Sequence, residues 1–181
     1  MSGDLKIKNP KFPGIYRARV EDNTDPDMIG RVRARAVPMF TGIITARLPW
    51  AVPAFGLFEG AGDNIGCITI PSVDSWVFVF FENGDMYQPV YFANAPTGKD
   101  SKKGIPSDLS DVNYPERKVW RTKSGVEIYI DDTDVELKVS HPAGCSIKID
   151  QSGNIEIDTA GKIDVTATGA IKIAGATVEI N

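Results

Sequence analysis

The C-terminal part of the chain repeats with a period of eight residues, and this repeat limits the possible folds more than any other feature. From Gly153 onward the unit is glycine, any residue, isoleucine or valine, any residue, isoleucine or valine, and its glycines fall at 153, 161 and 169. Because side chains alternate between the two faces of a strand, each apolar pair points one way and the residue between them points the other way. Glycine gives the backbone freedom needed at each corner.

One strand and one corner per eight residues cannot enclose a core within one chain, since a single-chain solenoid needs several faces per coil. If three chains wind about a common axis, each octad forms one side of a triangular prism and the apolar pairs meet inside. The sequence therefore predicts a trimeric β-helix. Its predicted core is Ile147, Ile149, Ile155, Ile157, Ile163, Val165, Ile171, Ile173, Val178 and Ile180.

Two other structures are alternatives for the repeat. A calcium-binding nonapeptide solenoid needs paired glycines and a regular aspartate, whereas the period here is eight and Asp164 has no counterpart in the neighbouring units. A single sheet of hairpins stays open as an alternative, although octads without Asn-Gly or Asp-Gly make poor two-residue hairpins.

The N-terminal half has a different pattern, with short strands separated by turn-rich segments. The expected strands are 15–21, 31–37, 66–70, 76–81 and 88–92. The strand at 76–81 is almost continuously apolar, which predicts a central strand covered on both faces. Five short strands within about 80 residues favour a small closed barrel of the oligonucleotide/oligosaccharide-binding (OB) type.

We therefore expect an all-β protein in four parts, with the boundaries set by changes in composition. A polar segment broken by Pro106 and Pro115 reads as a linker between the barrel and the repeat. The expected parts are an N-terminal arm at 1–11, the barrel at 12–95, the linker at 96–118 and the β-helical spike at 119–181.

Composition argues against most kinds of chemistry. The chain has 20 basic and 24 acidic residues and a single histidine, His141, so a multi-histidine metal site is excluded. It contains no glycine-rich phosphate loop and no Cys-x-x-Cys motif. We expect no enzymatic activity, no cofactor and no metal. The first 14 residues hold no apolar segment of signal-peptide length, so we expect no export by the general route.

Arginines and loop aromatics are the candidate contact residues. Arg31, Arg33 and Arg35 share the parity opposite to the apolar residues of their strand and so predict a basic outer face. The strand offers no outward aromatic for base stacking, which favours a protein or subunit contact over nucleic acid. The long apolar segment 38–64 either folds over the barrel or forms a protein-binding surface. Its candidate contact residues are Trp50, Phe55 and Phe58.

Several motifs, in this order, resemble the central spike proteins of contractile injection machines. The segment with Asp25-Pro26 followed by residues 30–35, GRVRAR, is similar to the "DP…GRVRVR" signature of phage baseplate assembly protein V and of VgrG spikes. Residues 81–85, FENGD, with Pro89-Val90, resemble a second block of that family, and residues 122–132 resemble the start of its spike.

The resemblance implies an OB collar and a trimeric needle located in the virion, at the tail baseplate. In that family the spike sits below the hub protein at the end of the tail tube and is driven through the target cell envelope. It also implies a structural role without nucleic-acid binding. The chain has no segment for a lysozyme-like insert and no His-x-His iron motif at its end, so a separate tip protein is a possible partner. Two alternatives stay open: an OB-fold protein that binds single-stranded nucleic acid and has an oligomerising tail, and a trimeric fibre or receptor-binding adaptor.

Overall fold

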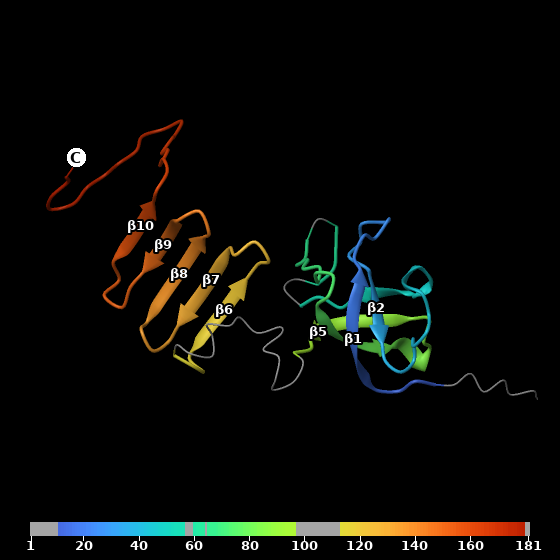
Figure 1. The fold of residues 1–181 in the computed structure, drawn as a ribbon. Coiled ribbons are helices and arrows are strands. Elements are labelled where there is room, and N and C mark those ends of the chain that lie inside the picture. The colour runs from blue at the N-terminus through green and yellow to red at the C-terminus, as the bar shows by residue number, and fades with distance from the viewer. Residues whose placement is uncertain (1–10, 57–59, 64, 97–112, 180–181) are drawn as a thin grey trace, which may run out of the picture. The chain divides into compact units, whose positions relative to one another are not determined.

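A computed structural model describes residues 11–56, 60–63, 65–96 and 113–179 of the chain (Figure 1). The chain divides into two compact units, Met1–Ile105 and Pro106–Asn181. Both units are built from strands. Among the described residues, no helix is long and apolar enough to cross a membrane.

The first unit is a closed barrel of five short strands. These are β1 (Ile15–Asp22), β2 (Val32–Ala36), β3 (Trp50–Pro53), β4 (Trp76–Phe81) and β5 (Pro89–Asn94), with 3₁₀ turns at Thr45–Arg47 and Glu82–Gly84. Their order around the barrel is β1-β2-β3-β5-β4, and β4 pairs with β1 to close it. The pairs are antiparallel except β3 with β5, which is parallel. The predicted five-stranded barrel is confirmed.

One of the five predicted strands was wrong. Residues 66–70 form no strand, and Ile68 and Ile70 are exposed. The missing strand is β3, which lies inside the segment 38–64 that was expected to be a loop. It is four residues long, ends in Pro53 and turns only Ala51 fully into the core. A strand this short shows too little alternation to be recognised from its sequence.

The barrel core consists of the inward side chains of the strands and two side chains from the β2–β3 connection. All are almost fully buried: Ala18, Val20, Val32, Ala34, Ala36, Phe40, Leu48, Ala51, Val77, Val79, Phe81 and Tyr91. Within the single chain β4 is fully covered on one face alone, because Phe78 and Phe80 on its outer face are only half-buried. In a closed barrel each strand has one face to the interior and one to the outside.

The second unit is a five-stranded antiparallel sheet in simple sequence order (Figure 1). Its strands are β6 (Arg117–Arg121), β7 (Glu127–Asp131), β8 (Glu136–His141), β9 (Cys145–Ile149) and β10 (Ile155–Thr159). Aspartate side chains stabilise two of the hairpin turns. Asp131 Oδ1 accepts the backbone N–H of Thr133 at 3.0 Å, and Asp150 Oδ1 accepts that of Ser152 at 2.9 Å.

The two faces of this sheet differ sharply in composition. In the strand register, apolar residues stand opposite apolar residues, as in Val139 with Ile147 and Ile147 with Ile157. Nine large apolar side chains share this face, and each is at least 38% exposed: Trp120, Ile128, Ile130, Leu137, Val139, Ile147, Ile149, Ile155 and Ile157. The other face is polar, with ion pairs such as Lys148 Nζ to Glu156 Oε2 at 2.7 Å.

Strand pairing ends at Thr159, although the octads continue. Residues 160–179 lie in no strand of the described chain, and they bend at 160–161, 168–169 and 176, eight residues apart. The predicted core residues in this segment are exposed, namely Ile163, Val165, Ile171, Ile173 and Val178, while Ile180 lies outside the described residues. A sheet of hairpins thus describes the single chain up to Thr159, and the trimeric β-helix stays a prediction.

Candidate functional site

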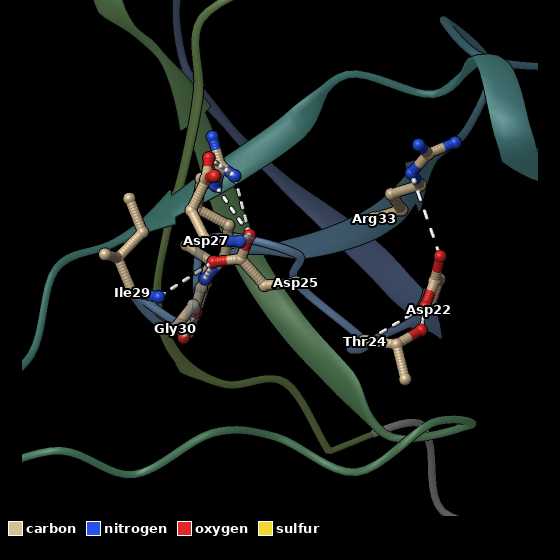
Figure 2. Close-up of polar contacts among 9 residues, drawn as sticks. Asp22, Thr24, Asp25, Asp27, Ile29, Gly30 and Arg33 are labelled. Carbon is tan, nitrogen blue, oxygen red and sulfur yellow. Dashed lines mark hydrogen bonds and ion pairs between the residues drawn. The ribbon is translucent and has the colours of Figure 1, made fainter.

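The connector between β1 and β2, residues 23–31, folds around the carboxylate of Asp25 (Figure 2). Asp25 Oδ2 accepts the backbone N–H groups of Ile29 at 3.0 Å and Arg31 at 3.1 Å, and Oδ1 accepts that of Asp27 at 3.1 Å. The Arg31 guanidinium donates to Oδ1 from Nε at 3.0 Å and from Nη2 at 2.6 Å. Asp25 is buried, and the Arg31 side chain holds the pKa of its carboxyl well below the usual range.

Gly30 links this connector to strand β5. Its φ of +85° lies in the left-handed region, and a Cβ at this position would come within 3.0 Å of the Phe55 ring. Its carbonyl accepts a hydrogen bond of 2.6 Å from the Tyr91 hydroxyl, which lies on β5. Burial, with a contribution from the Asp25 charge, raises the pKa of Tyr91 to about 12, so the hydroxyl stays a donor. The Asp-Pro and Gly-Arg residues of the signature are therefore parts of one loop anchor.

The three candidate arginines are all engaged with groups of the same chain; Arg31 directly precedes β2, and Arg33 and Arg35 lie on it. Arg31 pairs with Asp25 and Asp27. Arg35 donates to both carboxylate oxygens of Glu21, at 2.6 and 2.8 Å. This bidentate bond lowers the pKa of the Glu21 carboxyl.

Arg33 has weaker polar contacts and an aromatic neighbour. Its Nη1 donates to the Thr45 carbonyl at 2.9 Å, and its Nε lies 3.8 Å from Asp22 Oδ2, too far for a direct hydrogen bond. Its guanidinium carbon lies 4.5 Å from the centre of the Trp50 ring. Arg33 and Arg35 lie on the outer face of β2, as the strand parity predicts, and that face is engaged with carboxylates and carbonyls of the same chain.

The loop aromatics pack on the barrel wall. Trp50 is half-buried beside Arg31 and Arg33, and the Phe55 ring meets Tyr91 edge-on, with centroids 6.3 Å apart. Phe58 lies outside the described residues. The structure thus brings four of the candidate contact residues together on one side of the barrel, near Asp25 and Tyr91: Arg31, Arg33, Trp50 and Phe55. Arg35 lies further along β2. Their contact with a partner stays a prediction.

Among the described side chains, no group of three or more histidine, cysteine, aspartate or glutamate residues could hold a metal ion. A cavity of about 610 Å³ lies beside residues 53–68, with Phe55, Ile65 and Ile68 in its lining. None of its described lining residues carries a carboxylate, an imidazole or a basic group, and Cys67 is the one thiol among them.

Sequence reasoning missed one surface of the barrel. Ile15, Arg17, Phe78, Phe80 and Phe92 come together on the outer sides of β1, β4 and β5, and we name this group the aromatic face. The signal was present in residues 76–81, WVFVFF, where phenylalanine occurs at positions of both parities. A strand with large apolar residues on both sides predicts a second contact outside the core.

In a comparison with protein families, residues 16–94 match the model of the type VI secretion system/phage-baseplate injector OB domain. The matched range begins in β1 and ends on the last residue of β5, so it contains nearly the whole barrel. A comparison with curated proteins finds no match for the chain. The family match confirms the OB domain and supports a baseplate spike-type protein.

Proposed function

Because the barrel is the OB domain of the type VI secretion system/phage-baseplate injector family, we propose that this protein is the central spike of a contractile phage tail or of a related injection machine. In this proposal three copies form an OB collar and a β-helical needle. The collar joins the hub protein at the end of the tail tube, a separate tip protein is a possible second partner, and the needle pierces the target cell envelope. The role is mechanical and requires no catalysis.

The observation that carries the proposal is the exposed apolar face of the β6–β10 sheet together with the unpaired octads after Gly161. Nine large apolar side chains on one face of a sheet are unstable in water unless another surface covers them. At roughly 1.5–3 kcal/mol for a fully buried aliphatic side chain, covering them contributes on the order of 10 kcal/mol per chain before ordering costs. The octads that follow lack partners in the described chain, and further copies would supply them.

The polar face of the same sheet suits the outside of a needle. Arg117 Nε donates to Asp131 Oδ2 at 2.6 Å, and Lys148 pairs with Glu156. Arg121 pairs with Glu127 in the same way. A face of paired charges stays soluble and presents little apolar surface to a lipid or protein during passage.

The alternative functions gain no support from the geometry. A nucleic-acid-binding barrel needs free cations along the phosphate path, whereas Arg31, Arg33 and Arg35 are engaged with carboxylates and carbonyls. No feature of the described residues favours a receptor-binding adaptor.

Light scattering with size-exclusion chromatography tests the proposal first. We expect a mass of about 59 kDa, three times the chain's 19.7 kDa. A monomeric mass would contradict the spike proposal. In cells that produce the particle, we then expect loss of the protein to leave particles unable to inject. Salt-sensitive binding of a single-stranded oligonucleotide to the trimer would instead favour the nucleic-acid alternative.

A further inference from the structure

The aromatic face is a small apolar surface on the outside of the barrel. Ile15 is 62% exposed and Phe92 is 39% exposed. The Phe92 ring stacks on Phe78 with centroids 6.1 Å apart, and it lies 6.0 Å from Phe80. In the strand register Ile15 stands opposite Phe80, and Arg17 stands opposite Phe78. These side chains therefore touch one another and leave their outer surfaces to solvent.

The barrel core does not use these residues. They lie on the strand faces opposite to the buried residues Val77, Val79 and Ala18. Aromatic residues grouped on a surface mark a contact site, because they bury a large area at a low cost in side-chain entropy. A closed barrel has no free edge, so such a contact must be made by side chains.

We propose that the aromatic face is the contact between the barrels of neighbouring subunits. This inference rests on the trimer of the proposed function. The partner is a second copy of this chain. The aromatic face of one barrel packs against the barrel of the next subunit around the axis.

The position of the aromatic face along the chain favours this partner. Phe92 lies on β5, the last strand of the barrel, and only 16 residues, 97–112, separate the described barrel from the described spike unit. Sixteen residues span at most about 53–58 Å. If three spike units share one axis, this reach holds the three barrels together at an effective concentration on the order of millimolar. At that concentration even a weak aromatic contact is occupied.

The polar groups around the aromatic face are already satisfied. Arg17 lies with its guanidinium carbon 4.9 Å from the centre of the Phe78 ring, and it donates to the Pro96 carbonyl. Arg19, next on the same side of β1, pairs with Asp74. Covering the aromatic face therefore leaves Arg19 paired with Asp74 and leaves the Arg17 guanidinium with its carbonyl acceptor and the Phe78 ring, as expected for an apolar centre with a polar rim.

Thiol labelling of the full chain tests the contact. In a Cys67→Ser, Cys145→Ser background, Ile15→Cys places a probe on the aromatic face. Val52→Cys, at a residue that is 49% exposed on β3, is the matched control. Although Ile15 is the more exposed of the two in the single chain, we expect its cysteine to react at least about tenfold more slowly than the control in the trimer.

Two further variants separate the possible causes of slow labelling. Ile163→Asp, introduced to dissociate the trimer, should raise the rate at Ile15→Cys to that of the control. Phe92→Asn should raise this rate while the trimer mass is kept. Equal rates in an intact trimer would overturn the contact and leave the spike proposal standing. Slow labelling that persists in dissociated chains would also overturn it, because the chain itself would then cover the aromatic face. A monomeric wild-type mass would overturn both proposals.

Discussion

At the scale of single residues, Asp25 carries the most concentrated set of interactions in the barrel. One buried carboxylate accepts three backbone N–H groups and the guanidinium of Arg31. A carboxylate in this position replaces strand hydrogen bonds in a connector that belongs to no strand. Its effect is structural, since it shapes the turn that brings Gly30 to Tyr91.

The first prediction concerns this carboxylate. Asp25→Asn replaces one acceptor oxygen with an amide donor and leaves Arg31 without its main counter-charge. We expect the unfolding temperature of the barrel to fall by roughly 5–15 °C, because breaking a buried ion pair leaves the Arg31 guanidinium without its buried counter-charge. Thermal unfolding followed by near-ultraviolet circular dichroism measures this change.

Asp27→Asn is the matched control. Asp27 also pairs with Arg31, but its side chain is 64% exposed. An exposed pair contributes little, so we expect a change of at most about 2 °C. Equal losses for Asp25→Asn and Asp27→Asn would show that the loop does not depend on the buried acceptor.

A second prediction concerns pH and the buried carboxylate of Asp131. Burial raises the pKa of this carboxyl, but hydrogen bonds from Asn113 and Arg117 outweigh that effect and lower it from 3.8 to about 2. Since the folded pKa is depressed, the group stabilises the fold fully above about pH 4. This stabilisation is lost as the pH falls from about 4 to 2.

Comparing wild type with Asp131→Asn at several pH values isolates this group. We expect the wild type to be the more stable protein at pH 7 and the difference in unfolding free energy to shrink between pH 4 and pH 2. A difference that is constant over this range would mean that the carboxylate charge has no part in the stabilisation.

At the scale of strands and turns, the sequence predicted an element best where it alternates over a long segment. The strand expected at 76–81 has the bounds of β4, and the one expected at 15–21 differs from β1 only by Asp22. The strand expected at 66–70 alternates equally well but forms none, whereas β3 shows almost no pattern. Closure of the barrel determines which of the two segments becomes a strand. β3 pairs through its backbone with β2 and β5, and the alternation of apolar residues does not reveal such pairing.

The candidate site was predictable only in part. The outward parity of Arg31, Arg33 and Arg35 follows from the strand period, but their acid partners sit on β1 and its connector and are set by the register of the hairpin. Asp25 and Gly30 were noted as motif residues. Their hydrogen bonds to the connector and to Tyr91 depend on a turn and on a strand 61 residues away in sequence. Local patterns carry no information about such distant partners.

The third prediction tests the inward face of the octads. Ile163→Asp places one carboxylate from each of three chains close to one axis, where burial of like charges is prohibitive. We expect the trimer to dissociate or to lose its heat resistance, as measured by light scattering and by electrophoresis without boiling. Asp164→Asn changes the neighbouring outward residue and should leave both properties unchanged. An Ile163→Asp protein as trimeric and heat-resistant as its parent would show that the octads do not bury Ile163.

At the scale of the whole molecule, the two units draw their stability from different sources. Among its described residues, the barrel has a core of twelve buried residues from its own chain. The sheet of the second unit leaves its apolar residues exposed, so in the proposed trimer its stability comes from association. The unfolding of a unit stabilised by association depends on protein concentration, and that of a self-contained unit does not.

The last prediction follows from this difference. Phe40→Ala removes a fully buried ring from the barrel core, which typically costs about 3–5 kcal/mol. We expect calorimetry to show two transitions, of which this variant lowers only the one that is independent of concentration. Raising the protein concentration tenfold should move only the other transition to higher temperature. A single transition that responds to both changes would mean that barrel and spike unfold as one cooperative body. The collar would then transmit force to the needle through a continuous core, instead of through the residues that join two separately stable units.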